Sequence, residues 1–239
     1  MRIGGLQRLT LLDFPGTVSC TIFTIGCNYC CPFCHNALLA LKEREEELEG
    51  MSEEEVLDFL EGRRKRLDGV CITGGEPLLQ SDLRDFILKI RAMGYKVKLD
   101  TNGSNPKLLK QLIDEGIIDY VAMDIKNSPA KYAETIGLNG ELAEKMLNNV
   151  KESVELLKHG NIDYEFRTTV VDELHEVEDM TDIGKWLEGA ENYFIQDFND
   201  SGDLIDSNMH QMSYEKLKAI LDEARRFIPQ TGLRGTDEK

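Results

Sequence analysis

Short β-like runs alternate with amphipathic helical segments along the chain. Six runs rich in β-branched and aromatic residues predict strands at 18–24, 69–73, 96–100, 119–125, 164–171 and 193–197. This strand–helix alternation predicts an α/β fold with a parallel sheet and right-handed crossovers, either an open doubly wound sheet or a partial barrel. In both architectures, ligands bind beyond the carboxyl ends of the strands.

The predicted helices begin and end at local signals. Ser52 and Glu55 have the spacing of a capping box, Pro106 stands in a first helical turn, and Gly94 and Gly116 follow helix ends. Apolar residues at helical spacing predict a long helix over 142–158, a short one around 183–187 and a C-terminal one over about 213–227. Because no Pro-, Gly- or Ser-rich linker interrupts the pattern, residues 1–239 are expected to form one domain.

The charge balance narrows the set of partners. The chain has 28 basic and 44 acidic residues, which gives a formal net charge of −16. Non-specific binding to nucleic acid is not expected, because it needs Lys and Arg to neutralise phosphates. The sequence shows neither an apolar run of membrane-spanning length nor a secretory pattern, so a cytoplasmic protein with no membrane partner is expected.

Four of the six cysteines fall within residues 27–34, in a loop directly after the first predicted strand. Such clustering without an export signal is typical of metal or redox chemistry, not of a disulfide framework. One interpretation places two adjoining C-x2-C units around zinc, but structural zinc sites separate their cysteine pairs by roughly a dozen residues or more. A second takes Cys27, Cys31 and Cys34 as ligands of three irons in a [4Fe–4S] cube and leaves the fourth iron open. Buried inert thiols, the third interpretation, do not explain four cysteines in a loop flanked by Gly and Pro.

The C-x3-C-x2-C spacing, with Phe33 just before the last cysteine, resembles the motif of the radical S-adenosylmethionine (SAM) superfamily. The resemblance implies a partial (β/α)6 barrel whose cluster loop, residues 26–36, holds a [4Fe–4S] cluster that binds SAM at its open iron. It also implies that Phe33 packs beside the adenine of SAM. Cys30 departs from the usual pattern and is expected to be a bystander.

Motifs at the ends of later predicted strands extend the resemblance. The segment Gly74-Gly75-Glu76-Pro77 resembles the GGEP motif, which in the superfamily binds the amino group of SAM. Asp100-Thr101-Asn102-Gly103, Asp124-Ile125-Lys126 and Arg167 follow in the order found in activating enzymes of glycyl-radical proteins.

The resemblance to these activating enzymes implies particular roles. An arginine inside an apolar strand needs a partner, and Lys126 and Arg167 are expected to bind the carboxylate and ribose region of SAM. The resemblance further implies SAM contacts for Asp100 and Asn102, and a monovalent cation held by Asp100, Thr101 and Asp124. Pyruvate formate-lyase activating enzymes have a SAM-contacting histidine after the sixth strand, where Asn199 is the nearest residue by position in this chain. His210 is expected on the surface.

The opening residues, including the stretch 12–16, and Cys34-His35-Asn36 resemble the activating proteins of anaerobic ribonucleoside-triphosphate reductase. That family implies a radical SAM oxidoreductase that takes an electron from flavodoxin or ferredoxin and cleaves SAM to methionine and a 5′-deoxyadenosyl radical. The radical then removes a hydrogen atom from a glycine of the partner reductase. Two alternatives stay open: a radical SAM enzyme that converts a small molecule, such as a 7-carboxy-7-deazaguanine synthase, and an Fe–S electron-transfer module, which would normally need four cysteine ligands.

Overall fold

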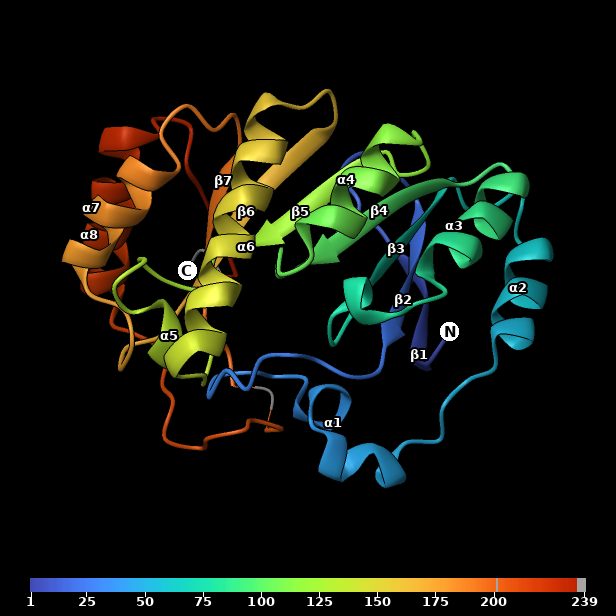
Figure 1. Ribbon diagram of the computed structural model, residues 1–239, viewed down its shortest axis with the longest axis horizontal. Helices are drawn as coiled ribbons and strands as arrows, with labels where there is room; N and C mark the ends of the chain where they lie inside the picture. Colours follow the sequence, from blue (N-terminus) through green and yellow to red (C-terminus); the bar gives the residue numbers. More distant parts are fainter. Residues whose placement is uncertain (201, 236–239) are drawn as a thin grey trace.

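The protein, described here from a computed structural model, is built around one eight-stranded sheet. Figure 1 shows how strands β1 to β7 and the helices are arranged. The structure describes residues 1–200 and 202–235; positions 201 and 236–239 of the expected domain lie outside the described residues. The strands lie in chain order, and all neighbours are parallel except the antiparallel pair β1 and β2. Their bounds are β1 Ile3–Thr10, β2 Ser19–Thr24, β3 Gly69–Gly74, β4 Lys96–Thr101, β5 Tyr120–Asp124, β6 Asp163–Val170, β7 Tyr193–Asp197 and β8 Gly232–Arg234.

Strands β2 to β7 correspond to the six strands predicted from the sequence, and the expected α/β partial barrel is confirmed. The two outermost strands were not predicted. β1 carries two glycines and no regular alternation, and it pairs with β2 through two register irregularities. β8 is only three residues long, so it has no recognisable period.

The helices follow the expected signals in most places. Their bounds are α1 Ala37–Ala40, α2 Glu53–Glu61, α3 Leu83–Ala92, α4 Pro106–Asp114, α5 Tyr132–Thr135, α6 Gly140–His159, α7 Val177–Trp186 and α8 Tyr214–Phe227, with 3₁₀ turns η1 Lys42–Glu47 and η2 Pro77–Leu79. The capping box before α2 is present: the Ser52 hydroxyl accepts from the Glu55 N–H at 3.1 Å, and the Glu55 carboxylate accepts from the Ser52 N–H at 2.8 Å. Helix α7 begins earlier than predicted, because Glu176 and Asp179 form a capping box that the apolar pattern does not reveal.

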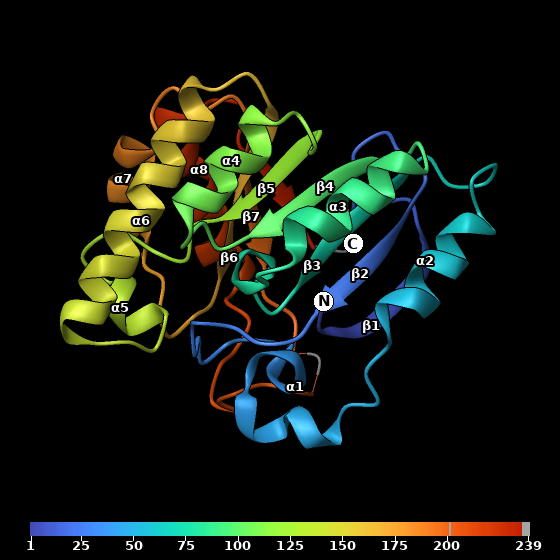
Figure 2. The same ribbon diagram turned by 45° about the vertical axis from the view of Figure 1, so that its right-hand side comes forward.

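The sheet is curved, and the crossover helices cover its outer face (Figures 1 and 2). Alternation along β4 shows how the two faces differ: Val97 and Leu99 belong to the hydrophobic core, whereas Lys98 and Asp100 lie on the opposite, concave face. The concave face is therefore where polar groups can gather. Within residues 1–200 and 202–235, no helix combines the length and apolar character needed to cross a membrane.

The loop that joins β1 to β2 covers the amino ends of the strands. The Phe14 ring lies 6.2 Å from the Tyr120 ring at the start of β5, and it packs directly over Gly69 at the start of β3. The Thr21 hydroxyl donates a hydrogen bond to the neighbouring Asp13 carboxylate. This loop thus closes the end of the barrel opposite to the one where the cysteine loop lies.

We expect Phe14→Ala to lower the free energy of unfolding by about 3–5 kcal/mol, because Phe14 is 4% exposed and its removal leaves a cavity between strands. The matched control is Leu12→Ala, since Leu12 is 91% exposed, and it should change stability by less than about 0.5 kcal/mol. Urea unfolding of the two variants measures the difference, and equal stabilities would contradict a packing role for Phe14.

Candidate functional site

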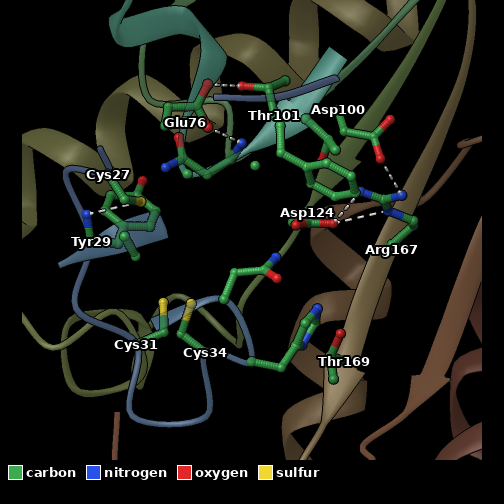
Figure 3. Close-up of a pocket in the computed structure, with 18 of the residues that line it drawn as sticks. Cys27, Tyr29, Cys31, Cys34, Glu76, Asp100, Thr101, Asp124, Arg167 and Thr169 are labelled. Carbon is green, nitrogen blue, oxygen red and sulfur yellow. Dashed lines mark hydrogen bonds and ion pairs between the residues drawn. The ribbon is translucent and has the colours of Figure 1, made fainter. Parts of the chain in front are cut away.

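A cavity of about 320 Å³ opens at the carboxyl ends of the strands (Figure 3). It brings together residues that are far apart in the sequence, from the loop after β2 and from the ends of β3, β4, β5 and β6. Of the site residues predicted from the sequence, the cavity is lined by Cys27, Cys31, Phe33, Cys34, Gly74, Gly75, Glu76, Asp100, Thr101, Asn102, Asp124, Lys126 and Arg167.

The cysteine loop divides its four thiols between two environments. Cys27, Cys31 and Cys34 line the cavity, and Figure 3 shows the Cys31 and Cys34 side chains pointing into it. Cys30 is exposed and lies outside, because its N–H donates to the Ile136 carbonyl at 2.9 Å and turns this part of the loop toward the segment after α5. The geometry therefore brings the C-x3-C-x2-C cysteines together at the cavity and separates Cys30 from them.

The three thiols suit a cluster better than a single ion. No three Cys, His, Asp or Glu side chains of the described chain converge closely enough to hold one metal ion, whereas a [4Fe–4S] cube takes its thiolates at separate irons. Burial raises the pKa of Cys27 and of Cys31 to about 12. Ligation of iron must therefore release protons from these thiols.

Two glycines let the loop after β3 approach the cysteine loop at backbone distance. The Gly74 backbone has φ of +116°, and a Cβ there would stand 2.3 Å from the Thr24 nitrogen. A Cβ on Gly75 would stand 2.1 Å from the Gly26 carbonyl oxygen. The Glu76 N–H then donates to that same carbonyl at 2.8 Å, so the GGEP segment holds the first residue of the cluster loop in place.

The Glu76 side chain connects the ends of β3 and β4. Its carboxylate is 1% exposed and accepts hydrogen bonds from the Thr101 hydroxyl at 2.6 Å, the Asn102 N–H at 2.7 Å and the Leu78 N–H at 3.0 Å. Burial nevertheless raises the pKa of Glu76 to about 7. Pro77 is buried at the start of η2 and does not line the cavity. Its contribution is therefore to the conformation of the loop and not to the cavity surface.

An ion network occupies the wall formed by β4, β5 and β6. Arg167 donates to Asp100 and to Asp124 at 2.9 Å each, and Lys126 donates to Asp124 at 3.0 Å. Lys98 donates to the other oxygen of Asp100. Burial alone would raise the pKa of Asp100, but the charges of Arg167 and Lys98 outweigh it and hold that pKa below its usual range.

Two side chains at this wall were missed from the sequence. Lys98 stands in the middle of an apolar strand, and the argument that singled out Arg167, that a buried cation needs a partner, applies to it equally. His175 is buried: its Nδ1 accepts from the Val171 N–H at 3.1 Å, so its Nε2–H donates to the Lys126 carbonyl at 2.8 Å. The ring also meets Phe33 edge-on at 6.3 Å, which braces the cluster loop. No sequence signal marks His175.

At the edge of the cavity formed by β7, the expected residue Asn199 is replaced by Gln196. Asn199 is exposed beyond the end of β7 and does not line the cavity; Gln196, on β7 itself, does. The Gln196 amide oxygen accepts from the Thr169 hydroxyl at 3.4 Å. His210 lies on the surface, as expected, and pairs there with Glu173.

Comparison with known proteins assigns the family. Residues 21–187 match the model of the Radical SAM superfamily. This chain belongs to that superfamily. The expected [4Fe–4S] cluster and SAM are thereby confirmed as its cofactors, while the roles of individual residues stay predictions.

Similarity to individual proteins covers more of the chain than the residues that the family model matches. The "Putative glycyl-radical enzyme activating enzyme" of Methanocaldococcus jannaschii is 34% identical over 97% of this chain and 95% of that protein. A 7-carboxy-7-deazaguanine synthase of Methanopyrus kandleri is 36% identical over 42% of this chain and 46% of its own. Among solved structures, Streptococcus suis SuiB bound to S-adenosylmethionine shares the fold, with a TM-score of 0.65 and 13% identity over 89% of this chain and 49% of that one.

We expect Gly75→Ala to destabilise the protein by about 1–3 kcal/mol and to lower its iron content after anaerobic reconstitution, because the new Cβ would overlap the Gly26 carbonyl. The matched control is Gly62→Ala, at the end of α2, where a Cβ would stand 3.6 Å from its nearest neighbour. Iron and sulfide assays with thermal unfolding test both variants. Unchanged iron content and stability in Gly75→Ala would contradict the close approach of the two loops.

Proposed function

We propose that this radical SAM enzyme is an activating enzyme for a glycyl-radical protein. It cleaves SAM to methionine and a 5′-deoxyadenosyl radical, which removes a hydrogen atom from a glycine of the partner. Anaerobic ribonucleoside-triphosphate reductase is the partner we propose. The observation on which the proposal rests is the similarity to the glycyl-radical activating relative, which spans 97% of this chain, whereas the deazaguanine synthase match spans 42%.

We assign the cluster to Cys27, Cys31 and Cys34, which line one cavity while Cys30 does not. The cluster and SAM, when bound, supply the radical. We propose that Phe33, whose ring meets His175 edge-on, packs beside the adenine. Gly74, Gly75 and Glu76 offer their backbone to the amino group of SAM; Asp100, Asn102, Lys126 and Arg167 provide charged and polar contacts from the ends of β4, β5 and β6. Gln196 takes the edge position first expected for Asn199.

The remaining cavity wall supports a peptide target over an anionic metabolite. It carries one carboxylate, Asp13, and one imidazole, His35. The other side chains of this wall are mainly uncharged: Gln7, Thr21, Phe23, Tyr29, Asn36, Ala40, Cys71, Thr73, Thr169 and Gln196. The Lys126 and Arg167 side chains that line the cavity are both already paired with aspartates. Lys126 and Arg167 are the Lys and Arg side chains that line the cavity among the described residues, and both are assigned to SAM. A substrate or product carrying a carboxylate, as the name of the deazaguanine synthase implies, would compete with SAM for them.

We further propose that the enzyme works in the cytoplasm with flavodoxin or ferredoxin as its electron donor. The argument is chemical: three thiols that must stay reduced to bind iron suit a reducing compartment, and a low-potential carrier is needed to reduce the cluster.

The proposed activity predicts a radical on a partner protein. The enzyme, reduced anaerobically and supplied with SAM, is mixed with the anaerobic ribonucleotide reductase of the same organism. We expect an electron paramagnetic resonance signal of a glycyl radical, absent when SAM is omitted or when the target glycine of the reductase is changed to alanine. SAM cleavage that leaves no protein radical, together with conversion of a deazaguanine precursor, would favour the small-molecule alternative.

The cluster assignment predicts different outcomes for neighbouring cysteines. Cys31→Ala should abolish formation of 5′-deoxyadenosine and methionine from SAM under dithionite, because one iron loses its thiolate. Cys30→Ala is the matched control and should retain product formation, because Cys30 lies outside the cavity. Product formation by Cys31→Ala, or its loss in Cys30→Ala with a correctly folded protein, would contradict the assignment. Absence of product from wild-type protein with a reducible cluster would favour the electron-transfer alternative.

A further inference from the structure

One buried lysine beside the cavity has no role in the proposed SAM contacts. The Lys98 side chain on β4 is 1% exposed, and its ammonium group donates to Asp100 Oδ1. It also lies 3.9 Å from the Cys71 sulfur and 5.9 Å from the centre of the Tyr120 ring. A buried ammonium is costly unless it is paired, so Lys98 needs Asp100 as much as Asp100 needs a cation.

The ligands expected for a monovalent cation beside SAM are already engaged by this chain. Each oxygen of Asp100 and of Asp124 contacts an ammonium or guanidinium group, from Lys98, Arg167 or Lys126. The Thr101 hydroxyl donates to Glu76 at 2.6 Å and accepts from the Gly103 N–H at 3.0 Å. The residues present therefore do not fit a bound cation without the displacement of a protein group.

The net charge of the network also disfavours a bound monovalent cation. Within the described chain, this network joins two carboxylates to three cations, which leaves one net positive charge. One positive charge matches the single carboxylate of SAM. A further cation would leave two net positive charges in this partly buried wall, where desolvation and the repulsion between like charges disfavour it.

We propose that the Lys98 ammonium replaces the monovalent cation beside Asp100, so that SAM binding in this protein does not depend on K⁺ or Na⁺. Lys98 does not line the cavity, so it acts as a positioning residue: it orients Asp100, which in turn holds one arm of the Arg167 guanidinium. This inference rests on the proposed SAM site but not on the identity of the glycyl-radical partner.

The first test uses the wild-type protein with its reconstituted cluster. The dissociation constant of radiolabelled SAM is measured by anaerobic equilibrium dialysis in choline chloride, NaCl and KCl at equal ionic strength. We expect differences of less than about twofold between these salts. Saturable tightening of SAM binding by K⁺ or Na⁺ would overturn the proposal. Because this test uses wild-type protein only, its outcome does not depend on whether a variant folds.

The second test asks whether an external cation can replace the lysine. In choline chloride, Lys98→Met should bind SAM about tenfold or more weakly than wild type, and K⁺, Na⁺ or NH₄⁺ should restore most of the loss. Restoration by a small cation is a response that a purely structural lysine would not give. Lys96→Met is the matched control: Lys96 is exposed on the same strand, and its loss should change neither the affinity nor the cation dependence.

The outcomes separate the two proposals. Wild-type protein that binds SAM only with added K⁺ or Na⁺ would overturn the role of Lys98 and leave the SAM site intact. A folded Lys98→Met protein that binds SAM as tightly as wild type in choline would do the same. Wild-type protein with a full cluster that binds no SAM in any salt would overturn both.

Discussion

Two aspartates lie at the ends of neighbouring strands on the concave face of the sheet, where they are partly buried, and Arg167 from the next strand pairs with both of them. Removing one partner of such a pair leaves a charge without compensation in a site that is largely withdrawn from water. The Arg167 guanidinium contacts Asp100 on β4 and Asp124 on β5 at 2.9 Å each. Arg167 thus ties the ends of β4, β5 and β6 to one another at the cavity.

The cysteine loop depends on a second constraint, the contact between backbones. Gly75 lies against the Gly26 carbonyl, and Gly137 lies against the Cys30 carbonyl, at positions where a Cβ would come within 2.2 Å of backbone oxygen. The two contacts hold the loop at two points, its first residue and Cys30. Together they leave three thiols in the cavity and turn the fourth away, so packing as well as cysteine spacing supports the proposed ligand set.

The regular part of the fold and the cysteine motif could be predicted from the sequence, because strands β2 to β7 and the C-x3-C-x2-C loop depend on local pattern. What could not be predicted depends on tertiary contact. β1 forms because β2 offers an edge, not because its own sequence alternates. Gln196, and not Asn199, reaches the cavity because β7 ends at Asp197 and the chain then turns outward. The ion pair of Lys98 could have been predicted, since a buried lysine within an apolar strand needs an acidic partner.

Two different parts of the sheet form the walls of the cavity, and this bears on which target the enzyme selects. The charged wall on β4, β5 and β6 comes from strands with a clear sequence pattern. The opposite part of the lining comes from β1, β2 and the loop between them, which contribute the uncharged Gln7, Thr21 and Phe23 and one carboxylate, Asp13, which accepts a hydrogen bond from Thr21. In the proposed function the first wall serves SAM and the second faces the target. A carbon radical of this energy discriminates poorly between C–H bonds, so the position of the target glycine must supply the selectivity. In the proposed function, Gln7 of β1 and Thr21 and Phe23 of β2 therefore help to set the position of the target.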